Sequence, residues 1–87
     1  MTNQDKQVVL VTGGSRGIGS SICSMLAENN YFVICNYNNS KTDAEALASQ
    51  YDNMVTKQFD VSSFEDTTAA IKEIENNYGP VSVLINN

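Results

Sequence analysis

The stretch "VVLVTGGSRGIG", residues 8–19, decides the fold of this chain. Its first four residues, Val8 to Val11, form a continuous apolar run, as expected of a strand that is buried on both faces of a parallel sheet. From Gly17 onward, apolar residues recur at steps of three and four, which predicts a helix that runs to about Glu28. A glycine-rich turn between a buried strand and a helix is typical of a site for a dinucleotide pyrophosphate.

Each glycine of this turn has a separate expected role. Gly13 allows the tight turn, Gly17 lets the backbone approach the pyrophosphate, and Gly19 lets the helix pack closely on the strand. The N–H groups at the helix start would face the phosphates, where the helix dipole adds roughly half a positive charge. A P-loop for ATP or GTP would instead need Gly-Lys-Ser/Thr at the helix start, where this chain has residues 17–20, "GIGS". A simple structural turn would need fewer glycines.

The rest of the chain alternates between further strand and helix patterns. Strands are predicted at Tyr31–Cys35, Met54–Phe59 and Val81–Ile85. Residues 36–41 are predicted to form a loop, and Thr42 with Glu45 forms a capping box that opens the second helix.

Ser62 and Ser63, with Glu65 or Asp66, are predicted to cap the third helix. Gly79 is expected to close that helix in a left-handed conformation before Pro80. The resulting order, β-α-β-α-β-α-β, predicts an α/β fold: the N-terminal part of a doubly wound Rossmann fold with parallel strands in the order 3-2-1-4. Residues 1–87 are therefore expected to form one incomplete domain.

Composition excludes several classes of function. The net charge of −5 argues against a nucleic-acid partner, and no apolar run approaches the roughly 20 residues of a membrane span. The polar start, Met1 to Gln7, lacks the pattern of a secretory signal, which favours the cytoplasm. Cys23 and Cys35 lack CxxC spacing and are expected to be buried thiols. There is no histidine, and no metal site is expected.

Three motifs in register resemble those of the short-chain dehydrogenase/reductase family. Residues 12–19, "TGGSRGIG", resemble its TGxxxGxG loop, and most of all the loop of bacterial 3-oxoacyl-acyl-carrier-protein reductases. Asp60-Val61 looks like the family's adenine-contacting pair, and Asn86-Asn87 looks like the opening of its NNAG motif. From the residues alone, Asp60 could equally cap the following turn, and the two asparagines could be a polar strand end.

The resemblance implies the cofactor-binding N-terminal portion of an NADP-dependent carbonyl or 3-oxoacyl reductase, from a family of homo-oligomers. In that family a serine and a YxxxK tyrosine and lysine, which lie beyond NNAG, carry out proton transfer. No catalytic residue is therefore assigned here, and the chain is expected to be inactive on its own. The alternative is a free-standing nucleotide-binding module, or a non-functional truncated product. Tyr37 and Lys41 match YxxxK, but a loop after the second strand would not align them.

Charge at the end of the second strand favours NADP over NAD. NAD sites place an acid about 20 residues beyond the glycine loop, whereas no acid follows Cys35 until Asp43. Arg16 is placed to pair with a 2′-phosphate, and Ser15, Asn36 and Lys41 could add donors. The residues predicted to bind the cofactor are Gly13, Ser15, Arg16, Gly17, Ile18, Gly19, Asn36, Tyr37, Asp60, Val61, Asn86 and Asn87.

Overall fold

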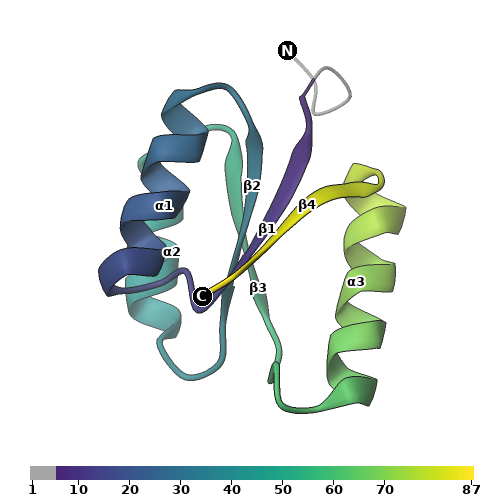
Figure 1. Ribbon diagram of the computed structural model, residues 1–87. Helices are drawn as coiled ribbons and strands as arrows, with labels where there is room; N and C mark the ends of the chain where they lie inside the picture. Colours follow the sequence, from purple (N-terminus) through teal and green to yellow (C-terminus); the bar gives the residue numbers. More distant parts are fainter. Residues whose placement is uncertain (1–5) are drawn as a thin grey trace.

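The computed structural model describes residues 6–87; Met1 to Asp5, part of the polar start that favours the cytoplasm, lie outside the described residues. One parallel sheet has the strand order β3-β2-β1-β4 (Figure 1). The strands are β1 (Val8–Thr12), β2 (Phe32–Tyr37), β3 (Met54–Gln58) and β4 (Val81–Asn86). The helices are α1 (Gly17–Glu28), α2 (Lys41–Ala48) and α3 (Phe64–Tyr78). The predicted fold class, element order and sheet order are confirmed.

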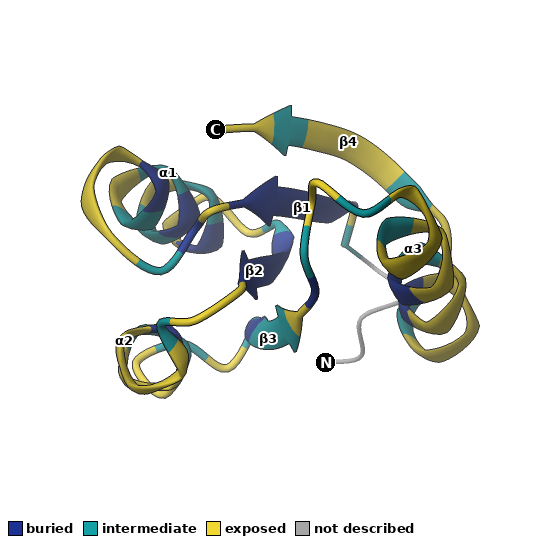
Figure 2. Ribbon diagram, turned by 90° about the horizontal axis from the view of Figure 1, so that it is seen from below, coloured by how far each residue is buried: buried dark blue, intermediate teal, exposed yellow. Residues whose placement is uncertain are grey.

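The helices cover the two faces of the sheet, with α1 and α2 on one face and α3 on the other (Figure 1). Every residue of β1 and β2 is buried, as the continuous apolar runs predict for central parallel strands (Figure 2). Alternate strand residues enter two separate cores. Under α1 and α2 lie Val9, Val11, Val33 and Cys35, and under α3 lie Val8, Leu10, Phe32 and Ile34.

The predicted end of the second strand was wrong. β2 begins at Phe32 rather than Tyr31 and continues through Asn36 and Tyr37, which were expected to lie in a loop. Asn36 pairs with Lys57 of β3, and Tyr37 pairs with Gln58. β2 therefore extends through these two residues because they pair with β3, although the sequence there is polar.

The predicted capping box of the second helix was also wrong. α2 begins at Lys41 with Ser40 as its N-cap, so Thr42 lies inside the first turn. The Ser40 side chain makes no capping hydrogen bond. With Thr42 as its N-cap the helix would begin at residue 43, whereas α2 begins two residues earlier, at Lys41.

The third helix confirms one predicted end and corrects the other. Ser63 is the N-cap, and its hydroxyl oxygen accepts a hydrogen bond of 3.1 Å from the Asp66 N–H. Gly79 has the positive φ of 101° that favours glycine, but its ψ of 177° is extended rather than left-handed helical. The chain therefore leaves α3 directly into the extended path of β4.

The start of helix α1 lies so close to the end of β1 that there is no room for a side chain between the two backbones. A Cβ added to Gly19 would lie 2.2 Å from the Gly13 carbonyl oxygen and 2.8 Å from Asn87 Nδ2. Gly14 is also confined, though less tightly, because a Cβ there would lie 2.8 Å from Cys23 Sγ and 3.1 Å from Cys35 Sγ. The close packing of helix on strand that the sequence predicts at Gly19 is therefore present.

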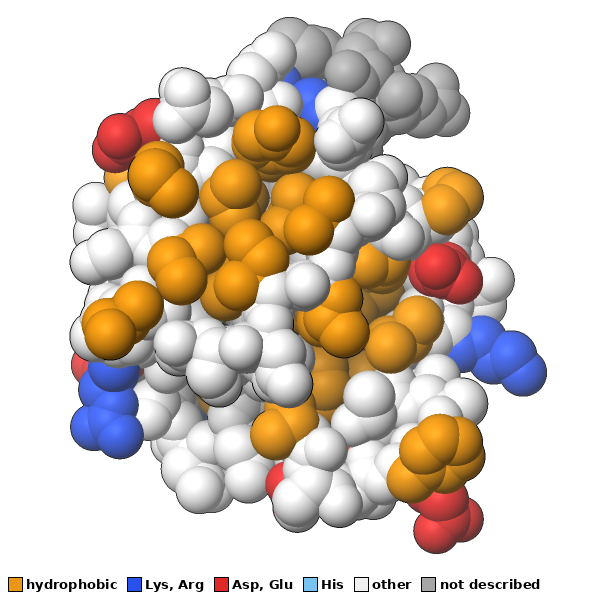
Figure 3. Space-filling model, in the orientation of Figure 1, with side chains coloured by type: hydrophobic (Ala, Val, Ile, Leu, Met, Phe, Trp, Pro, Cys, Tyr) orange, Lys and Arg blue, Asp and Glu red, His pale blue; other side chains and the backbone are white. Residues whose placement is uncertain are grey.

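β4 lies at one edge of the described sheet, and its side chains are largely exposed. Apolar side chains gather on the face crossed by α1 and β4 (Figure 3). The large apolar side chains that are exposed include Met25 of α1 and Val83 and Leu84 of β4. Within residues 6–87, no helix combines the length and the apolar character needed to cross a membrane.

We expect Gly19→Ala to lower the free energy of unfolding by about 1–3 kcal/mol, because the new Cβ would overlap a carbonyl oxygen that is held by the backbone. Urea unfolding followed by circular dichroism measures the change. Ser21→Ala is the control, because Ser21 lies in the same helix but is exposed. It should change the free energy of unfolding by less than about 0.5 kcal/mol. Equal stability of the two variants would contradict the close approach.

Candidate functional site

The carboxyl ends of all four strands meet at one edge of the sheet, which Figure 2 shows from below. Hydrogen bonds tie β1 to β4 there. Thr12 Oγ1 donates to Asn86 Oδ1 over 3.0 Å and accepts from the Asn87 N–H over 3.1 Å. Asn87 Nδ2 donates to the Gly13 carbonyl oxygen over 3.1 Å. The structure therefore brings Asn86 and Asn87 against the start of the glycine loop.

The glycine loop leaves open space in front of helix α1. Gly13 and Gly17 have φ values of 62° and 60°, and a Cβ on Gly17 would meet no atom within 4 Å. The N-cap residue Arg16 places no side-chain acceptor on the first N–H groups of α1, and the first turn contains no acidic residue. The helix dipole and these N–H groups favour an anion. The loop fits the pyrophosphate of a dinucleotide, with Ile18 exposed beside it.

A cavity of about 370 Å³, the loop cavity, opens between the glycine loop and the link from β2 to α2. Four of its lining residues were predicted from sequence, and three others were missed. The lining consists of Gly13, Ser15, Arg16, Tyr37, Asn38, Asn39 and Ser40. None of these side chains is a carboxylate, so the lining contains no group that would repel an anion by its charge.

Arg16 supplies the positive charge of the loop cavity. Its side chain is 74% exposed, and its Nε lies 3.9 Å from Asp43 Oδ2 in the first turn of α2. Ion pairs between exposed groups are weak, so Asp43 does not fix the guanidinium in place. Lys41, considered as a further donor, is exposed and is not among the residues that line the cavity.

Asn36 does not face the loop cavity, in contrast to its predicted role as a phosphate donor. The side chain is 2% exposed, and its Nδ2 donates to the carbonyl oxygens of Tyr37, Lys57 and Phe59 over 3.3, 3.2 and 3.1 Å. Its Oδ1 accepts from the Gly13 N–H over 3.1 Å. The amide hydrogens are thus engaged by the backbone and are not available to a ligand in the cavity.

Asp60 and Val61 follow β3 at the same edge of the sheet, outside the lining of the loop cavity. Asp60 Oδ1 accepts hydrogen bonds of 2.7 and 2.9 Å from Ser62 Oγ and the Ser62 N–H. These bonds hold the pKa of Asp60 below its usual value. Asp60 therefore caps the turn after β3, while the side chain of Val61 is 54% exposed.

The two cysteines lie together beneath Gly14. Both side chains are free and fully buried, as expected from the sequence. The hydrogen bond between the Cys23 and Cys35 thiols, together with burial, raises the pKa of Cys23 above its usual value. At neutral pH Cys23 is therefore a protonated, packed side chain rather than a nucleophile.

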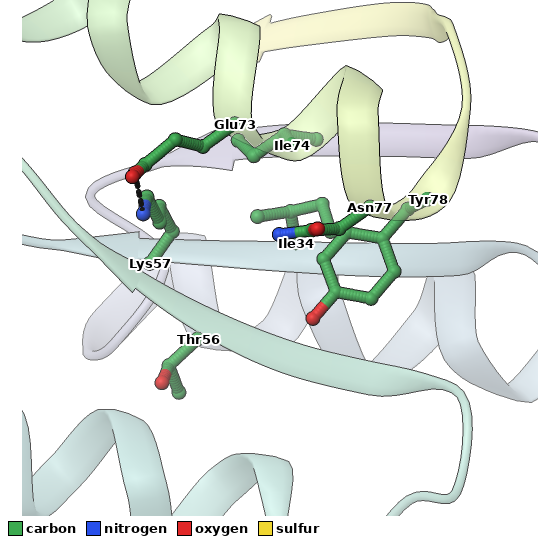
Figure 4. A pocket seen from close by; sticks show the side chains of 7 residues that line it. All are labelled: Ile34, Thr56, Lys57, Glu73, Ile74, Asn77 and Tyr78. Carbon is green, nitrogen blue, oxygen red and sulfur yellow. Dashed lines mark hydrogen bonds and ion pairs between the residues drawn. The ribbon is translucent and has the colours of Figure 1, made fainter.

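A second cavity, of about 140 Å³, lies between β3 and α3 (Figure 4). An ion pair between Lys57 and Glu73 crosses one end of it, and Asn77 and Tyr78 lie at the other end. It contains none of the predicted cofactor residues. In the part of the chain that the structure describes, no three side chains of the metal-binding types (His, Cys, Asp, Glu) gather as a cation site.

The residues that match YxxxK do not form a catalytic pair here. Tyr37 is the last residue of β2 and Lys41 is the first residue of α2, so no single helix aligns their side chains. Tyr37 is 9% exposed and lines the loop cavity together with the glycine loop. Tyr37 is thus part of the strand, and its predicted role beside the adenosine half of a cofactor stays a prediction.

Some residues of the site have no distinctive sequence signal. Asn38, Asn39 and Ser40 line the loop cavity, but their polar composition is that of any connecting loop. The sequence marks Asp43 only as the first acidic residue after the second strand. Its contact with Arg16 depends on the position at which α2 begins. A prediction of the exact helix start would have been needed to find that contact.

Comparison with known proteins places this geometry in a family. The family model described as short chain dehydrogenase matches residues 7–87. Acetoacetyl-CoA reductase of Paracoccus denitrificans is 40% identical over 81 residues, which cover 93% of this chain and 33% of that protein. The 3-oxoacyl-[acyl-carrier-protein] reductase of Staphylococcus aureus (strain Mu50) is 42% identical over 82 residues, covering 90% and 33%.

The fold is similar to that of solved members. A variant of actinorhodin polyketide ketoreductase, crystallised with NADPH, superimposes with a TM-score of 0.86 and 31% identity, covering 100% of this chain and 34% of that one. The chain thus spans about a third of the length of the proteins that it matches. With its glycine loop, sheet order and family match in agreement, the chain belongs to the short-chain dehydrogenase/reductase family of oxidoreductases.

Proposed function

We propose that residues 1–87 form the NADP-binding portion of an NADP-dependent carbonyl reductase. The observation that carries this proposal is the loop cavity, in which Arg16 is present and no carboxylate lines the wall. A 2′-phosphate would gain charge-assisted hydrogen bonds from a guanidinium there. The NADPH named for the similar polyketide ketoreductase supports the same choice of cofactor.

The proposed substrates are 3-oxoacyl thioesters. The two relatives described above are named as reductases of acetoacetyl-CoA and of 3-oxoacyl-acyl-carrier protein, and both substrates carry a ketone two carbons from a thioester. We further propose that the whole protein is a homo-oligomer, as the family resemblance implies. We also propose that it acts in the cytoplasm, where free thiols such as those of Cys23 and Cys35 stay reduced.

Each part of the site would hold one part of the cofactor. The first N–H groups of α1, from Gly17 to Gly19, would bind the pyrophosphate, and Arg16 and Ser15 would bind the 2′-phosphate. Val61 would pack against the adenine, next to Asp60, which holds the turn. Bound NADPH would supply the hydride for carbonyl reduction. The role of these residues is to bind and orient it.

We propose in addition that these residues bind cofactor without completing the reaction. A general acid must lie within hydrogen-bond reach of the carbonyl oxygen, and on a helix a lysine four residues from a tyrosine would share its face. Tyr37 is the one tyrosine followed by a lysine at that spacing, and the structure separates the pair between β2 and α2. A free-standing nucleotide-binding module would have the same properties.

Replacement of Arg16 tests the cofactor assignment. We expect Arg16→Ala to weaken NADPH binding about ten- to a hundredfold and to leave NADH binding within about twofold, because only NADPH carries the 2′-phosphate. Fluorescence titration of the wild-type chain and the variant measures both affinities. Lys72→Ala, on the exposed side of α3, makes the same change in net charge and should leave both unchanged. Equal losses for the two nucleotides would refute the assignment.

Removal of the carboxylate beside Arg16 should act in the opposite direction. We expect Asp43→Asn to tighten NADPH binding roughly two- to fivefold, because Asp43 competes for Arg16 and repels a 2′-phosphate. The gain should shrink as salt is added, since both groups are exposed. Glu45→Gln, on the same helix, is the control. A gain of the same size with NADH would show that the effect does not act through the 2′-phosphate.

An assay of turnover tests the proposed lack of catalysis. With NADPH and a β-ketoester, we expect the 87-residue chain to oxidise the nucleotide no faster than the rate without protein, because Tyr37 and Lys41 do not share a helix. Absorbance at the nicotinamide band follows the reaction. Turnover that Tyr37→Phe abolishes would overturn the proposal and would assign the proton donor to Tyr37.

A further inference from the structure

Asn36 connects three backbone segments at the carboxyl edge of the sheet. Its Oδ1 accepts from the Gly13 N–H at the start of the glycine loop, and its Nδ2 donates to carbonyl oxygens at the ends of β2 and β3. Its own carbonyl oxygen accepts a bond of 2.9 Å from the Gly14 N–H. Two consecutive N–H groups of the glycine loop are therefore bound to this one residue.

Because Asn36 is buried, loss of these hydrogen bonds would leave polar backbone groups without a partner. The residue is 2% exposed, so water does not replace a lost partner without rearrangement. Strand alternation puts Asn36 in register with Phe32 and Ile34, on the α3 face of the sheet. A larger apolar residue would fill this position with no acceptor for the Gly13 N–H. The path of the glycine loop thus requires a side chain at position 36 that can accept a hydrogen bond.

We propose that Asn36 is a positioning residue for cofactor binding, which fixes the direction in which Gly13 and Gly14 leave β1. This inference rests on the proposed function in assuming that the glycine loop binds the pyrophosphate. The start of α1 follows Gly14 by only three residues, so the direction of the loop sets where the N–H groups of that helix point. Asn36 therefore acts on the cofactor through the loop, without contact with it.

Asn36 and Arg16 should differ in how their replacement changes the affinities for NADPH and NADH. NADPH and NADH share the pyrophosphate, so loss of the loop direction should weaken both nucleotides to the same extent. We expect Asn36→Ala to weaken each roughly tenfold and to leave the ratio of the two affinities within about twofold of the wild-type ratio. Calorimetric titration, well below the midpoint of thermal unfolding of each variant, measures both affinities.

A second asparagine provides a matched control for stability. Asn53 Nδ2 donates to the carbonyl oxygens of Ala27 and Tyr31 over 2.9 and 2.7 Å, near the end of α1 and the start of β2. Asn53→Ala also removes hydrogen bonds that join segments of backbone, but at the opposite edge of the sheet. It should lower the unfolding temperature and leave both affinities within about twofold. An equal loss of affinity in Asn53→Ala would reduce the role of Asn36 to stability and overturn the proposal.

Hydrogen exchange in the wild-type chain tests the same bonds without a substitution. We expect the Gly13 and Gly14 amide hydrogens to exchange at least tenfold more slowly than those of Gly17 and Ile18 in the absence of cofactor, by NMR. Fast exchange at Gly13 would show that Asn36 does not hold the loop. Failure of the wild-type chain to bind either nucleotide, with Gly13 protected, would refute the proposed function and leave the loop-positioning role standing.

Discussion

The contact between the backbone of Gly13 and that of Gly19 is the constraint on which the site depends. It brings the first turn of α1 against the end of β1, where a single added Cβ would lie 2.2 Å from a carbonyl oxygen. The N–H groups at the start of the helix are thereby held at the carboxyl edge of the sheet, beside β2 and β4. An anion site built from backbone needs no lysine, but it does need this close approach.

The charges of the chain are arranged consistently with that site. The net charge is −5, yet the first turn of α1 has no acidic residue and the lining of the loop cavity has none. A local field at a cleft depends on the groups that line it, so an acidic chain can still hold a phosphate. Asp43 is the exception, because its carboxylate lies near Arg16 just outside the lining. At 3.9 Å from the guanidinium, this exposed carboxylate offsets only a part of the charge of Arg16.

Most of the fold could be predicted because its signals are strong and local. Buried apolar runs mark β1 and β2, and the glycine loop marks the start of α1. The errors lie where tertiary pairing overrides composition: Asn36 and Tyr37 have polar neighbours typical of a loop, but β3 pairs with them and extends β2. The start of α2 also differs from the prediction, because the helix begins at Lys41, one residue before the predicted cap Thr42. The contact of Asp43 with Arg16 was missed as a consequence.

The role of Asn36 could not be predicted from its residue type, because a strand end offers two faces and a shift of one residue exchanges them. As a loop residue it would have been free to turn toward a phosphate. As the fifth residue of β2 it points inward on the α3 face, while Tyr37 lines the loop cavity. The two last residues of β2 thus have different roles: Asn36 holds the glycine loop, and Tyr37 forms part of the cavity wall. Substitutions at these two adjacent positions should therefore have different consequences, because the side chain of Asn36 makes hydrogen bonds to the loop and that of Tyr37 lines the cavity.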